Sequence, residues 1–185
     1  MADAPQNFVL TLNGNPLSLD GRGSTSFPIN QAHTLELSSE IPFKGFLIRL
    51  GPQPGVSEFV TDFTEALQPS SSTDMKVEET HCVDIENVGG VTHTNSDDKT
   101  MVTAFLQMNE PAKDIIMDIT VVITNTGDTS EFYHTLLTLH AIDPADPSTD
   151  PNNPAGSSSS TSVTTTILLS GVCVGLASTF LLSFY

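Results

Sequence analysis

IIMDITVVIT, residues Ile115 to Thr124, is the clearest strand pattern in this chain. Ile119, Val121 and Ile123 recur at every second position, and β-branched residues dominate the run. This period buries one face of a strand and leaves the other face in water, whereas a helix would repeat its apolar positions every three to four residues. The segment therefore predicts a β-strand in the core of a sheet.

Other short runs share this composition and are separated by Gly, Pro, Asn, Asp and Ser, the residues of turns. They are FVLTLN (Phe8–Asn13), HTLELS (His33–Ser38), GFLIRL (Gly45–Leu50), SEFVT (Ser57–Thr61), MKVEET (Met75–Thr80), TMVTAFLQM (Thr100–Met108) and EFYHTLLTLHA (Glu131–Ala141). The pattern predicts an all-β fold, an Ig-like antiparallel β-sandwich of about seven to nine strands. The part of the chain that contains these runs has the length of a single domain, which we place at residues 1–141.

The composition changes abruptly after this domain. Residues 142–166 are rich in Pro, Ser and Thr and have few large apolar side chains, so we expect a disordered, extended stalk. Residues 167–185 (ILLSGVCVGLASTFLLSFY) carry no charge. About 20 such residues cross the hydrocarbon core of a bilayer as a helix, so this tail predicts attachment to a membrane.

The flanks of the tail indicate how it attaches. No Lys or Arg follows Lys113, whereas basic residues normally flank a permanent span. Small residues, a polar spacer and an apolar terminus form the signal for a glycosylphosphatidylinositol (GPI) anchor, with Gly156 or Ser157 as the attachment residue. The spacer Ser157–Thr166 fits the roughly 8–12 residues of such signals. A single transmembrane helix is the alternative.

The first residues do not contain a secretion signal. Residues Met1–Leu10 (MADAPQNFVL) have no basic residue and no long apolar run. Either the true start lies upstream, or the protein inserts by its tail and faces the cytosol. We prefer the first reading, which places the β domain outside the cell at the plasma membrane.

Charge and composition exclude several function classes. The chain has 22 acidic and six basic residues and a net charge of −16, which excludes nucleic acid as a partner and favours a soluble monomer. The sequence has no spaced Cys/His set for a metal, no phosphate loop, no cofactor fingerprint and no catalytic triad pattern. We therefore expect no enzyme activity, no cofactor and no metal ion.

Two segments combine turn residues with polar side chains. In the first, Phe43-Lys44-Gly45-Phe46, the phenylalanines point to a core and the glycine allows a close approach of neighbouring atoms. Gly51 follows on the same strand and has the same expected role. In the second, the side chains of Thr92, His93 and Thr94 (in VTHT) are expected to hydrogen-bond to a loop backbone.

Three further features are open to a chemical reading. His93 is expected to be a buried, hydrogen-bonded side chain because no second ligand lies at a metal-binding spacing. The pair His81–Cys82 has side chains on opposite faces of a strand, which disfavours a joint role. The loop Asn95–Asp98 offers oxygen ligands for calcium but lacks the spacing of a calcium loop, so a solvated turn is favoured.

Together the two segments resemble the reeler domain, the module at the start of reelin and the spondins. FKGFLIR matches one family motif, and Cys82 followed by VTHT and IIMDITVVIT matches the other, so the resemblance covers roughly Gly14–Ala141. It implies an extracellular recognition or adhesion module that binds a protein, glycan or matrix component. We expect the binding surface in the loops, where β-sandwiches carry function.

The resemblance also has departures. In the family the cysteine before VTHT pairs with an N-terminal cysteine, so it implies a disulfide for Cys82 whose partner would lie upstream of the present start. The family tryptophan is absent here, and Phe105 or Leu106 is expected to fill its place. Because reeler domains also occur in ferric reductases, an accessory piece of a membrane redox system is a second functional reading.

Overall fold

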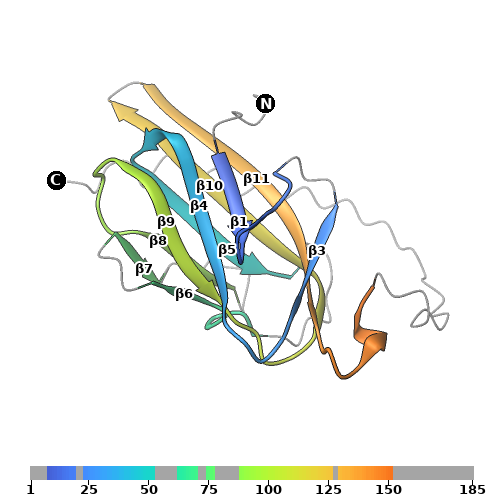
Figure 1. The fold of residues 1–185 in the computed structure, drawn as a ribbon. Helices are drawn as coiled ribbons and strands as arrows, with labels where there is room; N and C mark the ends of the chain where they lie inside the picture. Colours follow the sequence, from blue (N-terminus) through green and yellow to red (C-terminus); the bar gives the residue numbers. More distant parts are fainter. Residues whose placement is uncertain are drawn as a thin grey trace, which may run out of the picture.

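The computed structural model describes residues 8–19, 23–52, 62–70, 74–77, 88–126 and 129–151. Within these ranges, eleven strands form two sheets that pack face to face, followed by one short 3-10 helix (Figure 1). The predicted all-β sandwich is confirmed. The number of strands exceeds the predicted seven to nine because several strands are only two or three residues long.

Each sheet has a simple strand order. Sheet A has the order β2-β1-β4-β9-β6, with β1 at Phe8–Leu12, β2 at Asn15–Pro16, β4 at His33–Phe43, β6 at Leu67–Pro69 and β9 at Lys99–Leu106. Sheet B has the order β3-β11-β10-β5-β8-β7, with β3 at Ser24–Pro28, β5 at Gly45–Gly51, β7 at Met75–Val77, β8 at Gly89–His93, β10 at Ala112–Thr126 and β11 at Thr129–Ile142. The pairing is antiparallel except for β3, which runs parallel to β11.

The core lies between the two sheets and follows the period-two pattern of the sequence. Leu35 and Leu37 of β4 face it from sheet A, and Ile119 and Val121 of β10 face it from sheet B. Burial of a large apolar side chain contributes about 1.5–3 kcal/mol to stability, so these alternating positions dominate the choice of register. Strand β10, which the sequence predicts to lie in the core of a sheet, has β11 and β5 as its neighbours in the middle of sheet B.

Sequence reasoning missed β8, an inner strand of sheet B, and three strands at sheet edges. β2 and β6 are the outer strands of sheet A, and β3 is an outer strand of sheet B. An edge strand pairs on one side only and needs little apolar alternation, so it leaves a weak pattern in the sequence. Of the predicted strand Met75–Thr80 the structure describes β7, and the predicted strand Ser57–Thr61 lies outside the described residues.

The buried side chain of His33 forms hydrogen bonds with two turns near the start of β4. His33 at the start of β4 donates from Nε2 to the carbonyl oxygen of Pro28 at 2.7 Å. Its Nδ1 accepts from the side-chain amide of Asn13 at 2.8 Å. Asn13 has a positive φ of 52°, a conformation that asparagine tolerates better than most residues. His33 thereby connects the turn after β1 with the turn after β3.

The chain continues past β11 as a short ordered segment. The 3-10 helix Pro147–Thr149 is capped by Asp146, whose carboxylate accepts from the Ser148 amide at 3.0 Å. No helix within the described residues is long and apolar enough to cross a membrane. The predicted tail 167–185, the residues Gly156 and Ser157, and the pair His81–Cys82 all lie outside the described residues.

Candidate functional site

The two motif segments meet at one end of sheet B. Strand β5 begins at Gly45 and pairs with β8, so Leu47 lies opposite Thr92. The Thr92 hydroxyl donates to the carbonyl oxygen of Phe46 at 2.8 Å, and the Phe46 amide donates to Nδ1 of His93 at 3.2 Å. The expected hydrogen bonds of Thr92 and His93 to backbone are present, but the backbone belongs to strand β5 and not to a loop.

Gly45 is required by this contact. A Cβ at this position would lie 2.8 Å from Cε1 and 2.9 Å from Nε2 of His93, so the imidazole occupies the space that a side chain would need. The predicted close approach at Gly45 is therefore confirmed. Gly51 at the other end of β5 has a milder contact, 3.3 Å to a methyl group of Val88.

Sequence reasoning missed a third glycine of this kind. A Cβ at Gly89, the first residue of β8, would overlap the carbonyl oxygen of Phe63. The contact joins two segments distant in the sequence, and no local pattern reports it. An unusually small residue at the start of a strand was the only available signal.

The remaining motif side chains are structural in the described part of the chain. Phe43 and Phe46 are buried, as predicted, and their rings contact edge to face with centroids 6.4 Å apart. His93 is half-buried and hydrogen-bonded, with its ring 6.2 Å from that of Phe46. Thr94 is exposed, and its amide donates to the Asp74 carbonyl at 3.1 Å. Within the described ranges no three His, Cys, Asp or Glu side chains gather as a metal site.

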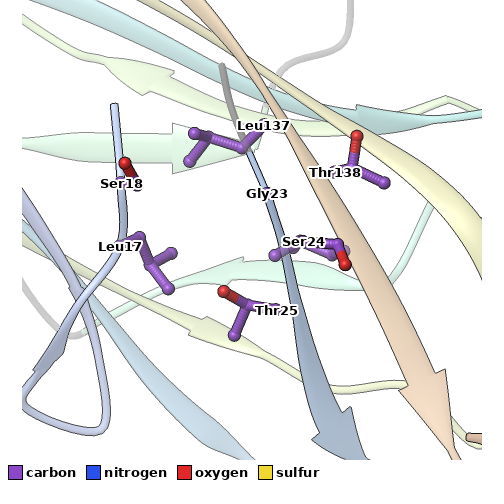
Figure 2. A pocket seen from close by; sticks show the side chains of 8 residues that line it. Leu17, Ser18, Gly23, Ser24, Thr25, Leu137 and Thr138 are labelled. Atoms are coloured by element: carbon purple, nitrogen blue, oxygen red, sulfur yellow. The ribbon is translucent and has the colours of Figure 1, made fainter. Parts of the chain in front are cut away.

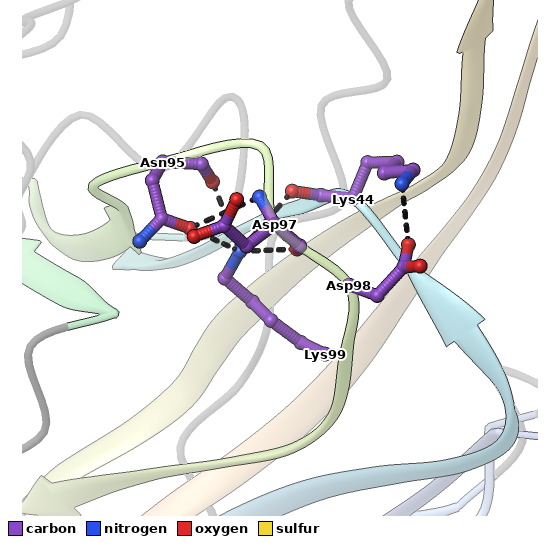
Figure 3. Close-up of polar contacts among 5 residues, drawn as sticks. All are labelled: Lys44, Asn95, Asp97, Asp98 and Lys99. Atoms are coloured by element: carbon purple, nitrogen blue, oxygen red, sulfur yellow. Dashed lines mark hydrogen bonds and ion pairs between the residues drawn. The ribbon is translucent and has the colours of Figure 1, made fainter.

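The loop after VTHT encloses the ammonium group of a lysine (Figure 3). Nζ of Lys99 donates to Asn95 Oδ1 at 2.8 Å, to the Asn95 carbonyl at 2.9 Å and to the Asp97 carbonyl at 2.7 Å. A longer contact of 3.4 Å reaches the carbonyl of Lys44. Lys99 is almost fully buried, which is rare for a lysine unless its charge is well compensated.

The charges around Lys99 are arranged to compensate it. Burial lowers the pKa of Lys99, and attraction by Asp74, Asp97 and Asp98 acts in the opposite direction. Lys44 forms an ion pair with Asp98 on the outside of the loop. The loop is therefore more than the solvated turn expected from sequence, because a buried cation organises it. Its oxygens already bind an ammonium group in the place where calcium was considered.

A small pocket lies beside strand β11 (Figure 2). It lies between the segment leading into β3 and the strand β11, has a volume of about 80 Å³, and is lined by Leu17, Ser18, Gly23, Ser24, Thr25, Leu137, Thr138 and Leu139. Sites for drug-sized molecules measure roughly 300–1,000 Å³. This pocket is too small for such a ligand.

The outer face of sheet A is the most distinctive surface of the described residues. The strand register places its outward side chains in three rows, which we call the sheet A surface: Val9, Ser38 and Met101; Thr11, Glu36 and Thr103; Thr34, Phe105 and Gln68. Val9, Met101 and Phe105 are 45%, 57% and 41% exposed. Glu36 is the one charged member of this surface. Phe105 thus faces solvent, whereas Leu106 is the neighbour that enters the core.

Solved structures supply the comparison with known proteins. The fold is similar to that of reeler domains. The human F-spondin reeler domain (fragment 1) matches with a TM-score of 0.49 and 12% identity over 77% of this chain and 85% of that chain. The Reelin-N domain of F-spondin matches with a TM-score of 0.48 and 13% identity over 77% and 92%. No family model and no curated protein sequence matches.

Identities this low concern the fold alone, so no binding property of F-spondin is transferred to this chain.

We predict that Lys99→Met destabilises the domain by about 2–4 kcal/mol, because it leaves four partly buried hydrogen bonds without their donor. Urea unfolding followed by circular dichroism measures the change. Lys113→Met removes an exposed lysine and serves as the control, with an expected effect within about 0.5 kcal/mol. Equal effects of the two substitutions would contradict a structural role of the buried ammonium group.

Proposed function

We propose that this protein is a non-enzymatic recognition or adhesion module, displayed on the outside of the plasma membrane, that binds a protein or glycan through the sheet A surface. The observation that carries the proposal is the exposure of Val9, Met101 and Phe105 on a nearly uncharged face. Exposed apolar side chains gathered on one face of a domain can mark an interaction surface.

The contrast with the rest of the molecule strengthens this reading. The whole chain has a net charge of −16, which keeps most of its surface strongly hydrated and repels acidic partners. The sheet A surface carries the single carboxylate of Glu36, flanked by Thr11 and Thr103 in the register. A partner can therefore approach here without meeting a concentration of negative charge.

The layout of the surface fits a flat partner. Its apolar members lie in the first and third rows, and hydroxyl and amide side chains lie beside them. Apolar contacts with polar neighbours are typical of protein interfaces, and hydroxyl, amide and carboxylate groups also hydrogen-bond to sugar hydroxyls. The strands are held by the core beneath, so the surface is already formed before binding.

Membrane display is supported by the sequence of the tail. The small residues Gly156 and Ser157, the polar spacer and the uncharged run 167–185 form the arrangement of a GPI-anchor signal. An anchored β domain outside the cell is consistent with a surface built for contacts with neighbouring molecules. The ligand identity is left to experiment.

We predict that cells displaying the full chain adhere to at least one member of a panel of immobilised matrix proteins and glycans, neutral and acidic. The double substitution Met101→Asp and Phe105→Asp is expected to reduce this adhesion at least tenfold, because it places charge on both apolar rows of the sheet A surface. Thr100→Asp, an exposed position on the same strand, is the control and should leave adhesion unchanged. Adhesion to no member, or adhesion that survives the double substitution, would overturn the proposed surface.

Treatment of such cells with phosphatidylinositol-specific phospholipase C is expected to release the protein into the medium, because this enzyme cleaves a GPI anchor. Bulky residues substituted at Gly156, Ser157 and Ser158 are expected to abolish both display and release, since the attachment site needs small side chains. Antibody staining before and after treatment measures both. Wild-type protein that stays on the membrane after treatment would instead support a transmembrane helix.

A further inference from the structure

Strand β11 is longer than the strand that pairs with it on its outer side. Its inner neighbour β10 accompanies it along its whole length, whereas β3 pairs only with Thr138–Ile142. Figure 1 shows β11 extending well beyond β3. Over Glu131–Leu137, no described strand pairs with the side of β11 that faces away from β10. This part of β11, which we call the β11 edge, therefore presents backbone hydrogen-bonding groups at the border of sheet B.

The β11 edge is fixed in place by its core-facing side chains. Tyr133 and Leu137 are buried, and so is Thr135. The hydroxyl groups of Tyr133 and Thr135 both donate to the carbonyl oxygen of Leu19, at 3.2 and 2.9 Å. These contacts hold the strand extended without occupying its outer face, so the edge is ready to accept another strand.

The outer face of the same segment is apolar at both ends. Phe132 is 64% exposed and Leu136 is 47% exposed, and the two lie four positions apart. His134 lies midway between them on the same face and bonds to Asp118 of β10 at 2.9 Å. The segment thus reads apolar, polar, apolar around its centre, with alternate residues directed into the core.

We propose that a second copy of this chain pairs with the β11 edge in antiparallel register centred on His134. In this register Phe132 lies opposite Leu136 of the second copy, and Leu136 lies opposite its Phe132. A two-fold axis that passes between the two His134 residues relates the copies. Each copy then covers the exposed Phe132 and Leu136 of the other, which is the self-complementarity that a symmetric dimer requires. The new ladder also satisfies the backbone groups of the edge.

No like charges meet directly at this edge in the proposed register, although the two copies repel each other at long range. In the proposed register Glu131 lies opposite Leu137 of the second copy, so no carboxylate meets a carboxylate directly. Asp118 is already paired with His134 within each copy. The remaining repulsion between two chains of net charge −16 is long-range, and salt screens it. Dimerisation should therefore strengthen as ionic strength rises, contrary to the monomer that net charge alone favours.

The proposal is independent of the sheet A surface, which lies on the other sheet.

Cross-strand neighbours in an antiparallel pair have Cα atoms about 4.5–5.5 Å apart, within the range that a disulfide spans. His134→Cys in the full chain displayed on cells is therefore expected to form a disulfide-linked dimer on mild oxidation. Non-reducing gel electrophoresis with an antibody to the β domain measures it.

Two variants make the test specific. Thr120→Cys lies directly beside His134 in the register, but on β10, one strand in from the edge, and is expected to give at least fivefold less dimer. Adding Phe132→Asp and Leu136→Asp to His134→Cys is expected to remove the dimer, because these changes place four carboxylates in the contact. The wild-type chain controls for dimers formed through Cys82 or Cys173.

Several results would contradict the proposed dimer. Equal cross-linking of His134→Cys and Thr120→Cys, or cross-linking that survives the two Asp substitutions, would overturn the proposed register. A cross-linked species of a mass other than twice that of the chain would show that a different protein occupies the edge. In detergent, sedimentation of the full chain should show a dimer that tightens at least threefold from 50 to 300 mM NaCl, and a monomer at every concentration tested would reject the proposal.

Discussion

The backbone of Phe46 is the point on which one end of this sandwich depends. Its carbonyl oxygen accepts from the Thr92 hydroxyl, and its amide donates to the imidazole of His93. Buried backbone groups that lose their partners cost about 1–3 kcal/mol each, so two side chains of β8 complete a ladder that would otherwise end unsatisfied. The imidazole lies in the space that a side chain at Gly45 would need. The two sequence motifs are thus the two halves of one contact.

The contact between β5 and β8 also positions the loop and the strand that follow β8. Once β8 is held against β5, the chain leaves His93 at a defined place, and the loop Asn95–Asp98 closes over the ammonium group of Lys99. Lys99 begins β9, which pairs with β4 in the opposite sheet. The same few residues therefore connect the end of sheet B to the end of sheet A. A buried cation in a chain this acidic is stable here because backbone and side-chain oxygens replace its water.

A structural feature could be predicted from the sequence only where it imposes a local pattern on the residue order. Period-two alternation identified β4, β5 and β10, because burial of every second residue is written directly in the residue order. Edge strands such as β3 were missed because one-sided pairing imposes little pattern. Lys99 and His33 were missed because their partners are mostly backbone oxygens or distant side chains. The sheet A surface needed the register, since Val9, Met101 and Phe105 come from strands far apart in the chain.

The same limits explain why the proposed binding surfaces could not be predicted from the sequence. FKGF and VTHT were selected from the sequence, and in the structure their residues contact each other within the fold. The apolar surfaces proposed for binding were invisible to motif reasoning. Exposed Phe105 resembles any strand residue until its outward direction is known, and the border position of Phe132 depends on how short β3 is.

A double-mutant cycle at Gly45 and His93 tests the central contact most directly. Gly45→Ala alone is expected to destabilise the domain by about 2 kcal/mol, because the added methyl group collides with the imidazole. In the background of His93→Ala, the same substitution is expected to cost less than about 0.5 kcal/mol, since the obstructing ring is gone. Urea unfolding of the four proteins gives the coupling energy. Costs for Gly45→Ala that are equal in both backgrounds would show that the two motifs do not meet as described.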